Sequence, residues 1–218
     1  ARISPADTVL DVACGPGLVA CAVAPFAQRV TGLDLTPEMI AEARRAQAAQ
    51  GLTNVDWQVG TAVPLPFEEA AFSVVLTRYS LHHFADPGAA LAEMFRVCRP
   101  GGRVLVADLC IPSPQGARFD AVEQLRDPSH VHTLAPEELR GLFLGAHAED
   151  LDEADYGLEI ELEGQLERSF PVPGSVDRIR HVYEANIALD SLGIRPRRVD
   201  GQIWSTWPVR VIAGSKQG

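Results

Sequence analysis

Two glycines and two acids near the start of the chain have the spacing of a nucleotide-cofactor site. Gly15 and Gly17 lie in the stretch LDVACGPGLVA, and with Ala20 they satisfy the pattern G-x-G-x-x-G/A. Asp11 precedes the first glycine by four residues, and Asp34 follows it by nineteen. A carboxylate at the position of Asp34 can accept hydrogen bonds from both hydroxyls of a ribose, which suits any adenosine cofactor. The glycines alone fit a tight strand-to-helix turn equally well.

The charge of Asp11 distinguishes between two kinds of cofactor. A dinucleotide brings an anionic pyrophosphate to the glycine loop and the helix N-terminus, where a further carboxylate is unfavourable. S-adenosylmethionine instead carries a sulfonium cation and an ammonium group, and a carboxylate at the end of the strand attracts both. Asp11 therefore favours a sulfonium cofactor over a nicotinamide dinucleotide.

A histidine pair and a distant acid form a second candidate group. His82 and His83 follow the expected strand 72–80, and Asp108 closes the expected strand 103–110. Because the carboxyl ends of parallel strands meet at one edge of a sheet, either histidine can meet Asp108 there. A histidine, with an ordinary pKa of about 6.5, is suited to remove the proton of a phenol when a carboxylate orients it. We expect His83 rather than His82 to be the base and Asp108 to position it; packing or capping by the histidine pair is the alternative.

An alternation of buried strands and helices must position these groups in the first half of the chain. The expected strands are 8–13, 29–35, 55–60, 72–80 and 103–110, and the expected helices are 17–27, 36–51 and 86–98. The strands are continuous apolar runs, which predicts a parallel sheet covered on both faces.

The pattern changes after Cys110. We expect helices at 117–130, 135–147, 159–170 and 175–192, a weak strand at 151–156, and a β-rich ending at 203–213. The chain is interpreted as one domain, residues 1–218. Residues 1–110 form the cofactor-binding core, 111–200 an acceptor-side insertion with closing helices, and 201–214 a closing strand.

The composition excludes several classes of partner. A formal net charge of −10 argues against binding to a nucleic-acid backbone, and no apolar stretch is long enough to span a membrane. The first residues show no secretory signal. The four cysteines lack metal-ligand spacing, which predicts reduced thiols, no metal site and a cytoplasmic location. A homodimer is expected only because dimers are common.

Five stretches of the first half together resemble the class I S-adenosylmethionine-dependent methyltransferases. In the family's order they are VLDVACGPG, VTGLDLTPEMI, VPLPF, LHHF and EMFRVCRPGGRVLVAD. The most similar branch is the small-molecule group with a methyltransferase type 11 domain, related to the ubiquinone/menaquinone C-methyltransferases. The resemblance is strong over residues 8–108 and weaker beyond them. It implies a Rossmann-like, seven-stranded, mostly parallel sheet between helices, with a helical lid inserted after the fifth strand. Only residues 1–7 precede the first strand, so we expect the family's N-terminal helices to be missing.

The resemblance also implies which residues contact the cofactor's methionine and ribose. Asp11, Ala13, Gly15 and Gly17 would surround the methionine end, and Asp34 would hold the ribose. Capping of the following helix is the alternative role for Asp34.

The adenine contacts that the resemblance implies come from three segments. Leu35 and Met39 would lie against the ring, Thr61 and Ala62 would flank its rim, and Arg78 would pass its backbone beside the cofactor. Thr61 stands where many family members have an acid, so its contact is the weakest implied.

The sequence supports a small-molecule methyltransferase that acts on a hydroxylated aromatic or polyketide-like acceptor, with carbon and nitrogen acceptors left open. One alternative is an NAD(P)-dependent oxidoreductase that uses the same loop. Its short-chain form lacks support, because Lys216 is the only lysine and no Tyr-x-x-x-Lys set exists. The other alternative is a catalytically inactive S-adenosylmethionine-binding protein.

Overall fold

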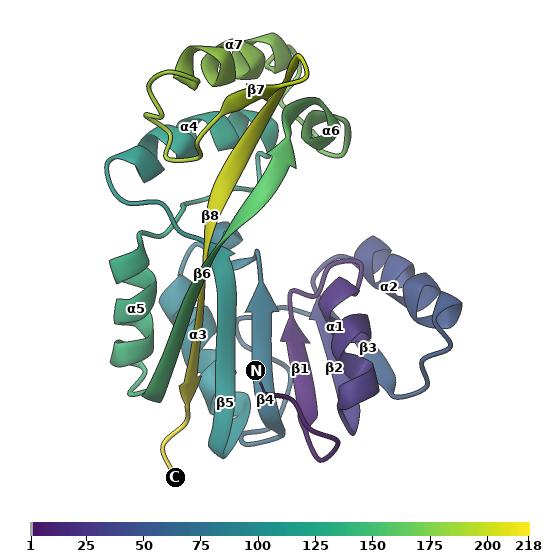
Figure 1. Ribbon diagram of the computed structural model, residues 1–218. Coiled ribbons are helices and arrows are strands. Elements are labelled where there is room, and N and C mark those ends of the chain that lie inside the picture. The colour runs from purple at the N-terminus through teal and green to yellow at the C-terminus, as the bar shows by residue number, and fades with distance from the viewer. Residues whose placement is uncertain (1) are drawn as a thin grey trace.

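One twisted sheet organises the computed structural model, which describes residues 2–218 (Figure 1). Seven strands follow the order β3-β2-β1-β4-β5-β8-β6, and a short β7 pairs with β8 off this path. The five parallel strands are β1 (Thr8–Val12), β2 (Arg29–Asp34), β3 (Val55–Val59), β4 (Phe72–Arg78) and β5 (Cys98–Leu109). Strand β8 (Gln202–Ser215) runs antiparallel to both β5 and β6 (Glu149–Glu161). The predicted Rossmann-like, seven-stranded, mostly parallel sheet is confirmed.

Helices cover the two faces of the sheet with separate apolar cores. On one face, α1 (Leu18–Val23) and α2 (Pro37–Ala49) pack with Trp57 over β1 and β2. On the other face, α3 (Pro87–Val97) and α5 (Pro136–Gly145) pack against β1, β4 and β5. Helix α3 illustrates the local rules, because Asp86 caps it by accepting from the amide of Ala89 at 2.9 Å and Pro87 occupies its first turn.

A third apolar core lies beyond the carboxyl ends of the strands, in a part of the chain that we call the lid. The lid comprises α4 (Gln115–Arg126), α6 (Leu162–Glu167), α7 (Val176–Asn186), β7 (Arg197–Val199) and the adjoining parts of β6 and β8. Figure 1 shows β6 and β8 leaving the core sheet and continuing upward among these helices. The lid is therefore built on strands as well as on helices.

The second half of the chain departs from several expected boundaries. Strand β6 is longer than the expected strand 151–156, because it pairs with β8 along most of its length. The expected helix 159–170 is wrong at its start, where residues 159–161 pair with β8; α6 begins only at Leu162. Helix α7 ends at Asn186, before the expected 192. Helix α5 packs on the core beside α3, so residues 111–200 do not all lie over the acceptor side.

The strand order reverses between β1 and β4, because β1 pairs with β2 on one side and with β4 on the other. In open sheets of this kind ligands bind at such a switch point. The residues that follow β1 and β4, Ala13 and Tyr79, both have positive φ values, of 53° and 56°. Backbone strain of this kind is concentrated at functional sites, and it marks this edge of the sheet.

None of the helices within residues 2–218 combines the length and the apolar character that a membrane crossing needs.

Candidate active site

The first hollow at the switch point, the β2–β3 pocket, lies beyond the ends of β2 and β3. It has a volume of about 210 Å³. Its walls are Ala13, Leu33, Asp34, Leu35, Gly60, Thr61, Ala62, Val63 and Phe84. The structure therefore brings together four of the residues that the sequence assigned to the ribose and adenine, namely Asp34, Leu35, Thr61 and Ala62. The Leu35 side chain is largely exposed there. An exposed apolar side chain beside a pocket is typical of a ligand-binding surface.

Asp34 organises the backbone around this pocket. Its Oδ2 accepts from the amide of Gly15 at 2.7 Å, and its Oδ1 accepts from the amide of Thr36 at 2.9 Å. The second bond holds the entry of α2, where the Thr36 side chain makes no capping bond. Because each carboxylate oxygen can accept more than one hydrogen bond, Asp34 still has capacity for ribose hydroxyls while it fixes the glycine loop.

The second hollow, the glycine-loop pocket, is also about 210 Å³ in volume. It is lined by Asp11, Ala13, Cys14, Gly15, Pro16, Leu18, Val19, Arg78 and Tyr79. Ala13 lines both hollows, so the glycine-loop pocket adjoins the β2–β3 pocket. Each of the two hollows is thus lined by one carboxylate, Asp34 in the β2–β3 pocket and Asp11 in the glycine-loop pocket.

Asp11 is the charged group of the glycine-loop pocket. Only 1% of its surface is exposed, and its Oδ2 accepts from the amide of Ala20 at 3.0 Å. Its Oδ1 has no hydrogen-bond partner within residues 2–218. Burial raises the pKa of Asp11 to about 7, against the opposing effects of the Ala20 hydrogen bond and of Arg78. A cationic ligand placed beside this carboxylate would stabilise its charged form.

The two glycines of the loop have different roles. A side chain added at Gly15 would meet no atom within 4 Å, so its backbone faces open space in the pocket. At Gly17, with φ of 80°, an added Cβ would lie 2.5 Å from the Trp57 ring and 2.8 Å from Ala43. Gly17 is thus required for helix packing and for the turn, and it lines neither pocket.

Two residues that the sequence assigned to the cofactor lie outside these pockets. They are Gly17, which packs beneath the loop, and Met39, which is half-buried on α2 and lines neither hollow. Arg78 does line the glycine-loop pocket, and its guanidinium carbon lies 4.8 Å from the centroid of the Tyr79 ring.

A third hollow, the lid pocket, lies between the core and the lid. It has a volume of about 210 Å³. Its walls are Tyr79, His82, Leu109, Glu123, Arg126, His130, Leu158, Ile160, Gln165, Trp207 and Val209. Tyr79 also lines the glycine-loop pocket, so this residue connects the two hollows.

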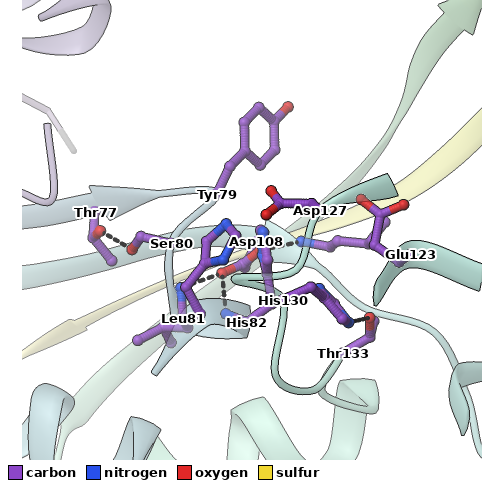
Figure 2. A network of polar contacts seen from close by, with 12 residues as sticks. Thr77, Tyr79, Ser80, Leu81, His82, Asp108, Glu123, Asp127, His130 and Thr133 are labelled. Atoms are coloured by element: carbon purple, nitrogen blue, oxygen red, sulfur yellow. Dashed lines mark hydrogen bonds and ion pairs between the residues drawn. The ribbon is translucent and has the colours of Figure 1, made fainter. Parts of the chain in front are cut away.

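His82 faces the lid pocket with one ring nitrogen held by a buried acid. Its Nδ1 lies 2.6 Å from Oδ1 of Asp108 (Figure 2). Oδ2 of Asp108 accepts from the amide of Leu81 at 2.6 Å, and its Oδ1 also accepts from the amide of Leu109 at 2.7 Å. Asp108 and its amide donors thus fix the imidazole, and Nε2 of His82 has no partner within residues 2–218. Asp108 raises the pKa of His82, although burial opposes the change.

The expected preference for His83 over His82 does not agree with this geometry. Nδ1 of His83 lies 3.1 Å from both the carbonyl and the hydroxyl oxygen of Ser129, and His83 does not line the lid pocket. Burial and the neighbouring His82 lower the pKa of His83. The two imidazole rings lie side by side, with centroids 4.2 Å apart, but only Nδ1 of His82 contacts Asp108.

Tyr79 lies between the cofactor side and the lid side. Figure 2 shows its ring projecting away from the His82 and Asp108 contacts. Its hydroxyl lies 2.6 Å from that of Tyr156 on β6. Burial and this hydrogen bond raise the pKa of Tyr79 above its usual value, so the phenol stays protonated at neutral pH. Tyr79 can therefore donate a hydrogen bond but cannot be the base.

The sequence analysis missed several pocket residues. Tyr79 and Phe84 lie within the stretch TRYSLHHF, in which only Arg78 and the two histidines were predicted to belong to the site. Glu123, Arg126 and Gln165 come from lid helices whose register the sequence does not determine. The aromatic residues Phe119, Phe143 and Tyr183 are fully buried core residues rather than pocket walls.

Histidines and acids are concentrated around the lid pocket, but within residues 2–218 no set of three or more such side chains is arranged to hold a metal ion.

Comparison with known proteins identifies the family. A family profile described as "Methyltransferase domain" matches residues 10–106. The uncharacterized methyltransferase YcgJ of Bacillus subtilis is 35% identical over 181 residues, which are 82% of this chain and 72% of that protein. The chain belongs to the methyltransferase family. The crystal structure of YcgJ superimposes with a TM-score of 0.89 at 28% identity, covering 100% of this chain and 95% of that one.

Two relatives with named substrates match about half of this methyltransferase. The demethylmenaquinone methyltransferase of Thermus thermophilus is 41% identical over 112 residues, which are 50% of each chain. The 27-O-demethylrifamycin SV methyltransferase of Amycolatopsis mediterranei is 36% identical over 124 residues, 56% of this chain and 45% of that protein. The chain thus spans half or less of the length of these two relatives.

The chain is an S-adenosylmethionine-dependent methyltransferase, and the oxidoreductase alternative is set aside. The site fits this cofactor, because Asp11, one of whose carboxylate oxygens lacks a partner within residues 2–218, lines the glycine-loop pocket, and the backbone of Gly15 is open there. A pyrophosphate would meet the same carboxylate at short range, which is unfavourable.

Proposed function

We propose that this methyltransferase transfers a methyl group to a hydroxyl oxygen of a small organic acceptor, a hydroxylated aromatic or polyketide-like molecule, that binds in the lid pocket. The observation that carries the proposal is the contact of 2.6 Å between His82 Nδ1 and Asp108 Oδ1, which leaves Nε2 of His82 without a partner in that pocket. The lid pocket in turn adjoins the glycine-loop pocket through Tyr79.

The cofactor-side residues have separate roles in the proposal. Asp11 attracts the positive charges at the methionine end, and Gly15 lets the chain approach there. Asp34 accepts from the ribose hydroxyls, while Leu35 covers the adenine. Bound S-adenosylmethionine supplies a methyl group that is activated by the positive charge of its sulfur.

The lid side supplies the base. Nε2 of His82 takes the proton as the acceptor's O–H bond breaks, and the oxygen forms its new bond to the methyl carbon. The S-adenosylmethionine held by Asp11, Gly15 and Asp34 would supply the methyl carbon, and its sulfur would keep the electron pair of the broken carbon–sulfur bond. Asp108 stabilises the resulting imidazolium from the Nδ1 side, so it is a positioning residue. The main task of the remaining walls is alignment and exclusion of water.

Size and polarity support a compact acceptor. A volume of about 210 Å³ suits one aromatic ring with its substituents, because a cavity of ~150 Å³ already holds benzene. Leu109, Leu158, Ile160 and Trp207 give the pocket apolar walls, and the polar groups gather around His82 and the lid helices. The name of the rifamycin relative indicates an oxygen acceptor for that enzyme, which supports an oxygen acceptor here.

The test is methyl transfer to one-ring phenols, anilines and their ring-only parents, with product analysis by mass spectrometry and NMR. We expect O-methyl ethers from phenols and no product from the parents. Because Asp108 raises the pKa of His82, the Asp108→Asn enzyme should lose about tenfold or more in kcat/KM and reach half of its own maximum at a lower pH. Methylation of carbon or nitrogen alone, or an unshifted pH profile in Asp108→Asn, would contradict the proposal.

A further inference from the structure

Two buried polar atoms of the lid pocket have no hydrogen-bond partner within residues 2–218. They are Nδ1 of His130 and Oε1 of Gln165, and both residues line the pocket. A buried polar atom without a partner costs about 1–3 kcal/mol, so native proteins rarely retain one. Both atoms belong to residues that line the same hollow, which indicates that a molecule bound there supplies their hydrogen-bond partners.

The contacts of His130 determine which kind of group it needs. Its side chain is only 1% exposed, and its Nε2 lies 2.7 Å from Oδ1 of Asp120. Asp120 also accepts from the amide of Thr133 at 2.9 Å and lies 3.0 Å from Nδ1 of His132. These hydrogen bonds keep the pKa of Asp120 at about 2, so the carboxylate is ionised and only accepts. Nε2 of His130 therefore donates to Asp120, and an imidazole that carries its single hydrogen on Nε2 presents Nδ1 as an acceptor.

The location of His130 places this acceptor near the proposed base. The rings of His82 and His130 have centroids 5.4 Å apart, and both line the lid pocket. Backbone bonds fix the approach, because the amides of Val131 and His132 both donate to the carbonyl of His82, at 2.9 and 3.2 Å. A molecule the size of one ring can thus reach both imidazoles at once.

The charged groups of the pocket argue against an anionic occupant. Oε1 of Glu123 accepts from Nε of Arg126 at 2.8 Å, and Oδ2 of Asp127 lies 3.6 Å from the same guanidinium. Glu123 is buried, and the Arg126 side chain is mostly so. Because two carboxylates share one cation, the wall offers no unpaired positive charge to a carboxylate of the acceptor.

We propose that the acceptor carries, besides the hydroxyl that is methylated, a second hydrogen-bond donor, and that it carries no carboxylate. The second donor bonds to Nδ1 of His130 and Oε1 of Gln165, while His82 receives the first hydroxyl. This inference rests on the proposed function, in which the lid pocket receives the acceptor. A site that presents buried acceptors rejects an analogue without the matching donor far more strongly than an apolar wall does.

The test measures binding without catalysis. The whole chain, saturated with S-adenosylhomocysteine, is titrated calorimetrically with the three benzenediols, their monomethyl ethers and the three hydroxybenzoates. We expect at least one diol to bind about tenfold more tightly than its monomethyl ether, because the ether leaves one buried acceptor unpaired. We expect the hydroxybenzoates to bind more weakly than that diol.

Three variants show whether the named atoms cause the preference. Gln165→Met removes the amide at similar length, and His130→Gln keeps a donor toward Asp120 while it removes the ring acceptor. Either change should reduce the preference for the diol to about threefold or less. Gln202→Met, the same substitution at an exposed residue of β8, should preserve the preference.

The outcomes separate this inference from the proposed function. Equal affinity for a diol and its ether, tighter binding of a hydroxybenzoate, or no binding of any of these compounds overturns the inference. A diol that binds with the expected preference but is never methylated supports the inference and contradicts the proposed function. Methylation of phenols without a preference for the diol supports the proposed function and contradicts this inference.

Discussion

The cofactor side and the lid side of this methyltransferase are built in different ways. Both adjoining hollows of the cofactor side are lined mainly by residues that directly follow β1, β2 and β3, and many of the contacts there involve backbone atoms. The lid pocket is lined by side chains from β5, α4, α6, β6, β8 and two loops. Two histidines, one glutamate and one glutamine are among these side chains. Residues of a few local loops can hold the cofactor. The choice of acceptor instead depends on side chains that come from segments far apart in the sequence.

Two residues with positive φ values connect neighbouring hollows. Ala13 joins the two cofactor-side hollows, and Tyr79 joins the cofactor side to the lid pocket. Both have left-handed backbone conformations that cost a non-glycine residue about 1 kcal/mol or more. The surrounding sheet holds them in place, and variants on either side can test whether the two sides work independently.

The largest effect is expected on the lid side, at His82. His82→Gln should reduce kcat by about 100-fold to 10,000-fold, because it removes the proposed base. Calorimetric affinity for S-adenosylhomocysteine should change by less than about twofold, since His82 lines neither cofactor-side hollow. The matched control is His83→Gln, which should retain kcat within about fivefold. A greater loss in His83→Gln than in His82→Gln would reverse the assignment.

On the cofactor side, Asp34→Asn should weaken S-adenosylhomocysteine by about 10-fold to 100-fold. The substituted amide loses a charged acceptor and places N–H groups against the amides of Gly15 or Thr36. Acceptor affinity in the saturated enzyme should remain within about threefold. Asp56→Asn, a similar change at an exposed position of β3, serves as the control. Loss of acceptor affinity in Asp34→Asn would show that the two sides are coupled.

Substitution of Asp11 is expected to increase the stability of the cofactor-free enzyme and to weaken its binding of S-adenosylhomocysteine. Burial raises its pKa to about 7, above that of the unfolded chain, so the folded state binds more protons between about pH 4 and pH 7. This group therefore lowers the stability of the cofactor-free enzyme as the pH rises through that window. Asp11→Asn should raise the free energy of unfolding at pH 8 by ~1–3 kcal/mol and flatten its pH dependence.

Urea titrations of the cofactor-free Asp11→Asn enzyme at pH 5 and pH 8 measure this difference. The same variant should bind S-adenosylhomocysteine more weakly, because the ammonium group loses its counter-charge. If the free energy of unfolding of the variant differs from that of the parent by the same amount at pH 5 and at pH 8, the proposed effect of burial on the pKa of Asp11 is contradicted.

The smallest effect is expected at Ala13. Ala13→Gly should stabilise the protein by ~0.5–1 kcal/mol, because glycine adopts the φ of 53° without steric cost. Ala41→Gly, the same substitution at an exposed helical position of α2, should instead destabilise it by ~1 kcal/mol. Thermal unfolding of both variants is the measurement, and a shift of the same sign in the two would exclude backbone strain at Ala13.

The sequence predicted the cofactor side because each functional residue follows a strong local pattern. A continuous apolar strand, a glycine turn and a helix start define the places of Asp11, Gly15 and Asp34. The family resemblance extended this reading to Thr61 and Ala62, which do line the β2–β3 pocket. Met39 lines neither hollow, and its contact with the adenine stays a prediction.

The lid side was predictable only in outline. Strand β6 is rich in acids at an exposed sheet edge, so its sequence lacks the apolar alternation of an ordinary strand, and its last residues were assigned to a helix. No periodicity separates His82 from His83, and the contact that distinguishes them comes from Asp108, which is distant in the sequence. The roles proposed for Gln165 and His130 could not be predicted, because the lid pocket that both residues line forms only when separate segments of the chain fold together.

The continuous pairing of β6 with β8 has a mechanical consequence. The two strands are paired from Asp152 with Ala213 in the core to Glu161 with Trp204 in the lid, so one stiff ribbon passes through both parts. Swinging the lid open as a whole would bend or break this ribbon. The segment of residues 127–133 is held differently, by individual hydrogen bonds to His82, His83 and Asp120, so acceptor entry is expected to need movement of this segment rather than of the whole lid.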